Sequence, residues 1–357
     1  MMIYIPMIFF SVFFMWLACH VTRRQKIIVL MISIAIPVVV AMLRYNNGAD
    51  YLMYLRMMKF AERHGSLAES FSSLKSVEIG FWVLLKFCGF IWPGEYFLTY
   101  GVSAAIICSF IYVAIWQTSE NPALSVYLFF ATGLYFDGYN ALRQYIAVAI
   151  VVYAYKYILE KDFKRYLIGI TVAFVFHYSA LIAIPFYFVR SFDINLKRAS
   201  ISALGCIVGG NIFYNIVAMF LNFTRYKYFL TSVEWKAQTQ TSAIIFTSFI
   251  SISTYAYIAW KKRPVSESFQ VMMNIQLLPW CIALLSIAIP ITWRVLYYVL
   301  PFEIFYIPAF LKEVKSKNAR IIFTILFVLL YTVITIWGMT QKNWYNALPY
   351  NYYFNYM

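Results

Sequence analysis

The chain has 357 residues, of which 63% are hydrophobic, 21% are aromatic and only 12% are charged, with a net charge of +15. A soluble domain would carry roughly twice that charged fraction, so the composition excludes a soluble enzyme or binding domain. It also excludes a nucleic-acid partner, because the chain has no soluble basic domain to bind one, and cytoplasmic loops and anionic lipid account for part of the charge.

Apolar runs of around 15–24 residues repeat along the chain, about the length that crosses a bilayer as a helix. They predict an all-α, polytopic integral membrane protein, since a membrane barrel would show alternating segments of about ten residues. The first run has no basic region before it and no cleavage pattern, so we expect a retained span rather than a signal peptide. The runs lie at 2–17, 27–43, 79–92, 96–116, 122–136, 141–159, 166–189, 199–221, 242–260, 271–290, 293–311 and 321–339.

Short basic joints follow several of these runs, and the positive-inside rule places all of them in the cytoplasm. They lie at 23–26, 160–165, 193–198, 261–264 and 312–320. An odd number of runs separates the first joint from the second, and the short run 79–92 is the best candidate for the one that does not cross. Only the run 166–189 separates the second joint from the third, so it must enter and return, with its midpoint at 176–180.

This topology predicts a single transmembrane domain over residues 1–357, with about ten full transmembrane helices plus two broken or re-entrant elements around an outward-facing cavity. The hydrophilic segments 44–75 and 223–241 become outer-face loops. The first holds five Lys/Arg against three Asp/Glu, and the second holds three against one. Because this surplus runs against the usual bias, we expect an anionic ligand outside.

Several groups of polar residues lie near the predicted outer ends of the helices. The first group lies in the segment that follows the second span. Arg44 stands at the end of that span, and Asp50 and Tyr54 share a helical face at i and i+4. The other interpretation is a capped interfacial helix with a tyrosine anchor.

The joint between the fifth and sixth runs carries Asn140, Arg143 and Gln144 at i, i+3 and i+4, on one helical stripe. Asp137 precedes them as a candidate cap. A guanidinium and two amides that face a cavity suit phosphate or sugar hydroxyls. The alternative is that Arg143 pairs with Asp137 or reaches lipid headgroups.

His177 lies at the turn of the run that enters and returns, followed by Tyr178 and Ser179. A single membrane histidine is often only a helix–helix hydrogen bond, but at this apex it is also a candidate general base, or a donor to a substrate oxygen. Further along, Arg225 lies among aromatic residues in the outer loop, and Arg294 stands at an outer helix end with Tyr298 one turn on.

The titratable residues offer no metal site. The five cysteines are scattered through apolar segments, which is typical of small core residues, and the three histidines are not grouped with carboxylates. We therefore expect no metal and no other cofactor.

The order of these segments resembles the EpsG/Wzy type of bacterial polysaccharide polymerases. The family pattern reads roughly R-x-x-x-G-x-D-Y-x-x-Y, E-x-G-[YF], N-x-x-R-Q-x-x-A and F-H-x-S-A. The resemblance covers most of the chain, is specific for these four blocks and is loose across 200–280. The matching positions are Arg44, Gly48, Asp50, Tyr51, Tyr54, Glu78, Gly80, Asn140, Arg143, Gln144, Ala147, His177 and Ser179, with Phe81 where Tyr is common.

The resemblance implies polymerisation of undecaprenyl-diphosphate-linked oligosaccharide units at the outer face of the bacterial inner membrane. The growing chain is the donor and a new unit is the acceptor. His177 and Asp50 compete for the role of base, and arginines rather than a metal neutralise the diphosphate. Together with the residue patterns, it gives as catalytic candidates His177, Asp50 and Arg143, and as binding candidates Arg44, Tyr51, Tyr54, Glu78, Asn140, Gln144, Tyr178, Ser179, Arg225, Arg294 and Tyr298.

The implied partners are the lipid-linked glycans and the bilayer, and further candidates are a chain-length regulator and a flippase of the same pathway. The main rival function is a lipid-linked oligosaccharide flippase, which should show two pseudo-repeated halves and charges spread through its spans. A secondary transporter and a membrane O-acyltransferase rank below it. The sequence specifies neither the sugars nor the linkage, and it does not separate O-antigen, capsule and exopolysaccharide.

Overall fold

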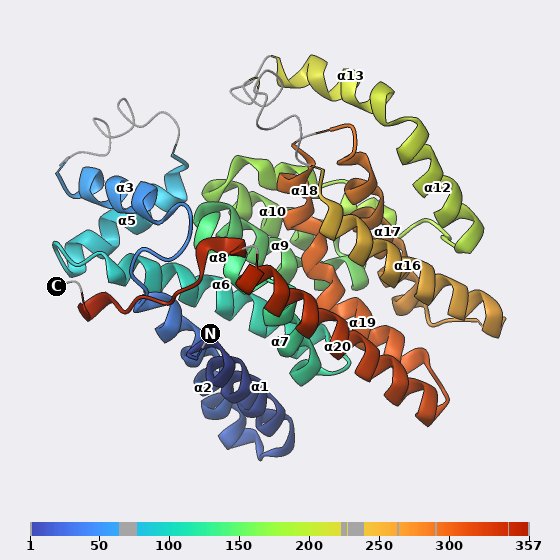
Figure 1. The fold of residues 1–357 in the computed structure, drawn as a ribbon, viewed down its shortest axis with the longest axis horizontal. Coiled ribbons are helices and arrows are strands. Elements are labelled where there is room, and N and C mark those ends of the chain that lie inside the picture. The colour runs from blue at the N-terminus through green and yellow to red at the C-terminus, as the bar shows by residue number, and fades with distance from the viewer. Residues whose placement is uncertain are drawn as a thin grey trace. The chain divides into compact units, whose positions relative to one another are not determined.

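The computed structural model describes residues 2–63, 77–222, 227, 239–262, 264–289, 291–341 and 343–355. Within these ranges the chain is built from helices, with one isolated bridge between Arg44 and Tyr352 (Figure 1). Seven of the described helices are long and apolar enough to cross a membrane, or up to eight when a bent pair counts as one span. The all-α, multi-pass membrane fold is confirmed, whereas the predicted count of about ten full spans is not.

The chain divides into two compact units, Met1–Ile184 with Val314–Met357, and Pro185–Glu313. The described helices of the first unit are α1 Tyr4–His20, α2 Arg23–Met42, α3 Tyr51–Arg63, α5 Ile79–Ile91, α6 Phe97–Thr118, α7 Pro122–Ala131, α8 Leu134–Asn140, α9 Leu142–Leu159, α10 Phe163–Phe176, η1 Tyr178–Ala183, α20 Lys317–Gln341, η4 Trp344–Asn346 and η5 Tyr353–Asn355. Those of the second unit are α11 Phe186–Val189, α12 Leu196–Val208, α13 Gly210–Leu221, α16 Thr241–Lys261, α17 Glu267–Leu285, α18 Thr292–Val299, η3 Leu300–Phe302 and α19 Glu303–Glu313.

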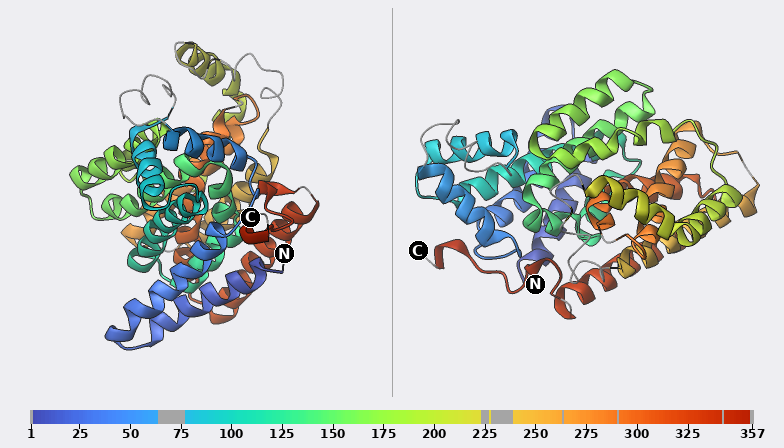
Figure 2. Two further views of the ribbon diagram at one scale, coloured as in Figure 1. Left: turned by 90° about the vertical axis from the view of Figure 1, so that its left-hand side faces the viewer. Right: turned by 90° about the horizontal axis from the view of Figure 1, so that it is seen from above.

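The core of the first unit is α9, against which α6 and α10 pack. Between Gln144 and Lys156 its sequence is apolar on every side, which is the pattern of a helix buried all round, and 13 of its 18 residues are buried. The helices α1 and α2 lie side by side (Figure 2). Ser11 Oγ donates to the carbonyl of Ser33 at 2.8 Å and Ser33 Oγ donates back to that of Ser11 at 2.7 Å, so two small polar residues hold the pair together.

The run 166–189 turns back on itself, as predicted. The helix α10 ends at Phe176, and His177 adopts an extended backbone with φ −156° and ψ 121°. The short helix η1 then folds against α10, where the hydroxyl of Tyr166 donates to the carbonyl of Ala183 at 2.6 Å. With 14 residues, α10 rises only about 21 Å, short of the roughly 30 Å hydrocarbon core, so it does not cross by itself.

Two further breaks lower the number of straight spans. The helices α12 and α13 meet at a 66° bend, where the sequence predicted one uninterrupted run. The run 122–136 is split after Ala131, where Gly133 has φ +85°, a left-handed conformation that favours glycine. The helix α5 has 13 residues, which confirms that the run 79–92 is too short to span.

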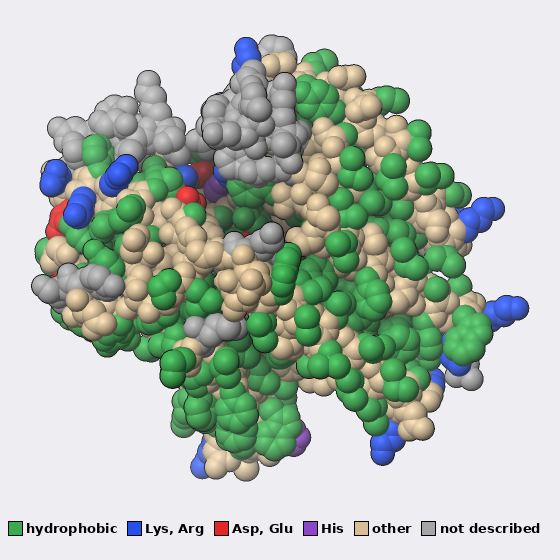
Figure 3. Space-filling model, viewed as in Figure 1, with side chains coloured by type: hydrophobic (Ala, Val, Ile, Leu, Met, Phe, Trp, Pro, Cys, Tyr) green, Lys and Arg blue, Asp and Glu red, His purple; other side chains and the backbone are tan. Residues whose placement is uncertain are grey.

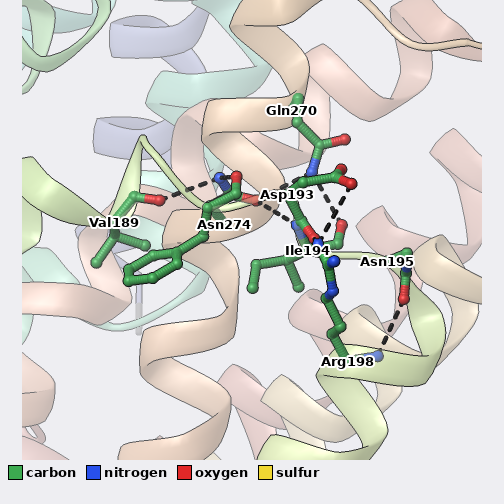
Figure 4. Close-up of polar contacts among 8 residues, drawn as sticks. Val189, Asp193, Ile194, Asn195, Arg198, Gln270 and Asn274 are labelled. Atoms are coloured by element: carbon green, nitrogen blue, oxygen red, sulfur yellow. Dashed lines mark hydrogen bonds and ion pairs between the residues drawn. The ribbon is translucent and has the colours of Figure 1, made fainter.

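In the second unit, a buried asparagine fixes the joint between α11 and α12 (Figure 4). The side chain of Asn274 is fully buried on α17, and its amide group donates to the carbonyls of Val189 (3.1 Å) and Phe192. Its oxygen accepts from the amide of Ile194 at 3.3 Å, and Gln270 donates to the Ile194 carbonyl at 2.9 Å. The segment that precedes α12 is thus tied to α17 through its backbone.

Candidate functional site

Three ionisable side chains of the first unit, Glu78, Arg143 and His177, meet at what we call the central cluster. The carboxylate of Glu78 is fully buried, and its Oε2 lies 2.6 Å from Nη1 of Arg143. Its other oxygen lies 3.9 Å from Nε2 of His177, which is beyond a direct hydrogen bond. In Figure 3, acidic, basic and histidine side chains are seen close together in the upper left of the molecule. One carboxylate is therefore shared between a permanent cation and a group that gains and loses a proton.

A glycine brings Glu78 to His177. Gly80 lies in the first turn of α5, and a Cβ placed there would come within 2.9 Å of both the carbonyl oxygen and Cγ1 of Val175, near the end of α10. Only a residue without a side chain permits this close approach of the two helices. Because Glu78 immediately precedes α5 and His177 immediately follows α10, the contact sets the distance between the carboxylate and the imidazole.

The imidazole of His177 is held by the turn that it begins. The backbone amide of Ser179 donates to Nδ1 at 3.3 Å, and Oγ of Ser179 lies 2.6 Å from the same nitrogen. A nitrogen that accepts from a backbone amide carries no proton in the neutral ring, so Nε2 bears the proton and directs it toward Glu78. The arrangement is a line from the Ser179 hydroxyl through the imidazole to a buried carboxylate.

Tyr54 completes the cluster from α3. It is 2% exposed, and its hydroxyl is hydrogen-bonded to the side chain of Arg143. The carbonyl of Asp50 accepts from the amide of Tyr54 at 3.0 Å, so Asp50 lies one turn earlier and is half-buried. The first and third motif blocks, far apart in sequence, thus meet at the guanidinium of Arg143.

The predicted stripe of Asn140, Arg143 and Gln144 is wrong for Asn140. The backbone breaks at Ala141, with φ −104° and ψ 48°, so Asn140 ends α8 while the other two belong to α9. The side-chain oxygen of Asn140 instead accepts from the amide of Ala49 at 2.6 Å. It therefore fixes the loop that leads into α3 rather than extending the surface of α9.

Close packing of the same loop requires a glycine. Gly48 has φ +103°, and a Cβ at this position would lie 2.9 Å from the carbonyl oxygen of Tyr139. Both the backbone conformation and the available space exclude a side chain. The glycine of the first motif block thus lets the loop before α3 rest on the end of α8.

Arg44 lies in a second cluster, built from tyrosine rings. It is 1% exposed, and its guanidinium carbon lies 3.8 Å from the ring centre of Tyr139 and 4.8 Å from that of Tyr100. Within the described part of the chain, its Nε and Nη1 atoms have no hydrogen-bond partner. Tyr51 stacks on Tyr100 with ring centres 4.6 Å apart, and burial raises the pKa of Tyr51 to about 12, which keeps this phenol neutral. Arg44 is thus stabilised by cation–π contacts in the interior.

The C-terminal segment closes over this arginine–tyrosine cluster. The amide of Tyr45 donates to the carbonyl of Asn351 at 2.9 Å, and the amide of Tyr353 donates to that of Leu43 at 2.8 Å. Asn47 donates to the carbonyl of Pro349 at 2.7 Å. The sequence did not identify Tyr100 and Tyr139 as partners of Arg44. The tyrosine-rich C-terminal stretch was the visible signal that this segment takes part in an aromatic cluster.

The remaining candidates have different surroundings. Gln144 is buried beside Arg143 on α9, whereas Tyr178 is 40% exposed and packs on Phe174. Arg294 and Tyr298 lie on α18 of the second unit, so their place in one site with Arg143 stays a prediction. Arg225 lies outside the described residues.

Asp137, the predicted alternative partner of Arg143, accepts a hydrogen bond from the hydroxyl of Tyr145 at 2.9 Å. The ion pair of Arg143 that the structure shows is made with Glu78. Among the described residues, no group of three or more His, Cys, Asp or Glu side chains could hold a metal ion.

Comparison with known proteins gives one family. A model of the EpsG family matches residues 27–352. No curated protein and no solved structure matches the chain.

Proposed function

Because the chain belongs to the EpsG family, we propose that it is a membrane glycosyltransferase that polymerises polysaccharide repeat units carried on undecaprenyl diphosphate. The growing chain is the donor and a new lipid-linked unit is the acceptor. The reaction takes place at the outer face of the bacterial inner membrane. Family membership supports a polysaccharide polymerase, and the central cluster supports the chemistry of the transfer step.

One observation carries the proposal: a fully buried carboxylate joins an arginine and a histidine at 2.6 Å and 3.9 Å. Buried ionisable groups in a membrane protein are costly and usually serve a function. Glycosyl transfer from a diphosphate requires a cation for the leaving group and a base for the incoming hydroxyl. The central cluster holds both of these side chains on one scaffold.

Arg143 is the proposed clamp for the leaving group. In the transfer, a new bond forms between the acceptor oxygen and the anomeric carbon of the donor. The bond from that carbon to the phosphate oxygen breaks, and undecaprenyl diphosphate leaves with the electron pair. A guanidinium placed at that oxygen stabilises negative charge as it develops. The side chain of Arg143 is 17% exposed, while Glu78 behind it is fully buried, so the cation is the accessible member of the pair.

His177 is the proposed base, and it acts through Ser179. Nδ1 of His177 is the nitrogen that can take up a proton, and Oγ of Ser179 lies 2.6 Å from it. The acceptor hydroxyl gives its proton to Ser179, whose own proton passes to Nδ1. The imidazolium that results has its second N–H directed at Glu78, which stabilises the charge. Asp50 remains the competing base, one turn before Tyr54.

The test is a complementation assay in a strain that lacks the chain, with surface polysaccharide separated by length on a gel. We expect Arg143→Ala and His177→Ala each to abolish long chains while single repeat units still reach the surface, because general acid–base groups typically contribute about 10²–10⁴-fold. Glu120→Gln, at an exposed position in the joint before α7, is the control and should give full-length chains.

Undiminished long chains in both alanine variants would refute the site assignment. Accumulation of units on the inner leaflet would instead favour a flippase.

A further inference from the structure

The side chain of Asn47, in the loop between α2 and α3, binds only backbone atoms of the C-terminal segment, residues 346–353. It is 1% exposed. Its Nδ2 donates to the carbonyls of Ala347 at 3.1 Å and Pro349 at 2.7 Å, and its Oδ1 accepts from the backbone amide of Asn351 at 2.9 Å. A buried amide group that is satisfied in this way is held in one orientation. Asn47 therefore fixes its loop to residues 300 or more positions further along the chain.

The backbone on either side of Asn47 is tied to the same segment. The amide of Gly48 donates to the carbonyl of Asn346 at 3.0 Å, and the hydroxyl of Tyr350 donates to the carbonyl of Val40 at 3.0 Å. Together with the two backbone bonds described above, these contacts extend along the whole loop. Because Asn47 contributes its side chain, a substitution there weakens the link without changing the backbone of either segment.

The loop also rests on the end of α8. The side-chain oxygen of Asn140 accepts from the amide of Ala49 at 2.6 Å, and the missing side chain of Gly48 allows the loop to approach the backbone of α8. The backbone at Asn46 is left-handed, with φ +52°, and such a conformation persists only where surrounding contacts hold it. The loop therefore has two supports, the C-terminal segment and α8, and Asn47 supplies the side-chain link to the first.

The helix α3 begins directly at this loop and extends to the central cluster. The carbonyl of Gly48 accepts from the amide of Tyr51 at 3.2 Å, and that of Asp50 accepts from the amide of Tyr54 at 3.0 Å. Tyr54 is 2% exposed, and its hydroxyl is hydrogen-bonded to the side chain of Arg143. Because hydrogen bonds fix each residue of a helix relative to the residue four positions before it, a shift of the loop moves Tyr54 as well.

We propose that Asn47 is a positioning residue for the transfer step, a proposal that rests on the proposed function. By binding the C-terminal segment it fixes the loop, the loop fixes the first turn of α3, and Tyr54 then holds Arg143 in place. Asn47 adds no charge to the central cluster, so it acts on geometry alone. A displacement of about 1 Å at a catalytic group costs roughly 10²-fold in rate, so a link of this kind is enough to decide activity.

The kinetic test compares Asn47→Ala with a chemically matched variant in the second unit, Asn274→Ala. Asn274 is also fully buried, and its amide group likewise donates to two backbone carbonyls and accepts from one backbone amide. Since both variants lose these bonds, the midpoint temperature of thermal unfolding in detergent should fall by a comparable amount. We expect kcat to fall about 10²-fold only in Asn47→Ala, with a much smaller change in KM. Equal losses of kcat in both variants, or wild-type kcat in Asn47→Ala, would overturn the proposal.

A milder substitution keeps the test decisive if Asn47→Ala fails to fold. Asn47→Ser retains a hydroxyl that can donate to one of the carbonyls. We therefore expect its kcat to fall severalfold, which is less than in Asn47→Ala. Wild-type kcat in Asn47→Ser together with a lower midpoint temperature would show that the bonds of Asn47 support stability alone.

A measurement without catalysis separates this proposal from the function. Hydrogen–deuterium exchange is recorded on the wild-type protein, Asn47→Ala and Asn274→Ala in nanodiscs. We expect faster exchange in Asn47→Ala across residues 43–58, which include the first turns of α3, whereas in Asn274→Ala the segment 189–194 should respond instead. Unchanged exchange in α3 would overturn the proposal. Faster exchange in α3 of a protein that makes no polymer would refute the function and leave the positioning of α3 by Asn47 standing.

Discussion

The role that the structure indicates for Glu78 differs from the role that the sequence suggested. Its place in a motif block suggested a contact with substrate, but its carboxylate is fully buried behind Arg143 and faces His177. A carboxylate without solvent contact can hold its charge only when cations or hydrogen bonds stabilise it. We therefore interpret Glu78 as a positioning residue that sets the orientation of the guanidinium and the imidazole.

Neutralising Glu78 should separate this role from simple structural support. Glu78→Gln keeps the shape of the side chain but removes the charge that holds Arg143 and stabilises the imidazolium. We expect kcat to fall at least about 10²-fold, with a smaller change in KM, because the lost interaction acts in the transition state. Glu78→Asp, which keeps the charge at a shorter reach, should recover part of kcat. The measurement is steady-state polymerisation by purified protein across pH. We expect the fall in activity on the acidic side to move to lower pH in Glu78→Gln, because the imidazolium of His177 loses the carboxylate that stabilises it, whereas Glu78→Asp should keep the wild-type profile.

The control for this series is Glu303→Gln in the second unit. Glu303 is also a buried carboxylate, 2% exposed, and accepts from Nε2 of Gln276 at 3.2 Å. The midpoint temperature of thermal unfolding in detergent should fall by a comparable amount in Glu303→Gln and Glu78→Gln. If both variants lose activity only in proportion to their stability, Glu78 is structural and the positioning role is refuted.

At this scale the sequence predicted residue types better than partners. The pattern of runs predicted that His177 lies at a turn, and the structure places it there, directly before η1. The sequence offered Asp137 only as an alternative partner of Arg143, and the ion pair in the structure is made with Glu78, separated by 65 positions. Local spacing cannot reveal a pair that forms only when two helices pack.

The elements around the site depend on small residues where backbones approach. The motif spacing from Glu78 to Gly80 has a physical reason, because the glycine allows α5 to rest on α10 and carries the carboxylate with it. In the same way, Gly48 allows the loop before α3 to rest on Tyr139. These glycines are part of the site because they set distances between side chains that they do not touch.

Gly80→Ala should therefore disturb the site without changing any polar group. The added Cβ would lie 2.9 Å from the backbone oxygen of Val175, which cannot rotate away, so α5 must shift. Overpacking of this kind costs about 1–3 kcal/mol, and we expect polymerisation to fall more steeply than stability because the distance from Glu78 to His177 changes. Chain-length gels and thermal unfolding would be measured on the same preparations.

Gly89→Ala is the matched control, since it lies on the same helix with no atom within 4 Å of the added Cβ. It should leave activity intact and slightly stabilise α5, because alanine is the better helix former. Full activity in Gly80→Ala would show that the close contact of α5 and α10 does not set the geometry of the site.

For the whole molecule, hydropathy and charge predicted the class of fold but not the number of spans. The parity of basic joints predicted that the runs 79–92 and 166–189 do not cross as single helices, and the helices α5 and α10 in these runs have only 13 and 14 residues. It could not reveal the 66° bend between α12 and α13, because both halves are equally apolar. The bend falls at Gly209, the residue between the two helices, and a hydrophobicity pattern alone does not mark it.

The side of the membrane on which the site opens follows from the same parity argument and has its own test. The two ends of α10 serve as reporters: Tyr178, just beyond its C-terminal end, is 40% exposed, and Lys164 in its first turn is also exposed. Each is replaced by cysteine in a background without the native cysteines, and intact spheroplasts are treated with a membrane-impermeant maleimide. We expect Tyr178→Cys to react from outside and Lys164→Cys to react only after permeabilisation.

The helix α10 rises only about 21 Å against a hydrocarbon core of roughly 30 Å. Reaction of position 178 from outside would therefore require water to reach below the membrane surface, which a substrate diphosphate also needs. Irregular backbone such as that at His177 is tolerated at this depth only beside protein or a water-filled cavity. Reaction of Tyr178→Cys only from the cytoplasmic side would reverse the topology and place the central cluster where lipid-linked units are made rather than where they are polymerised.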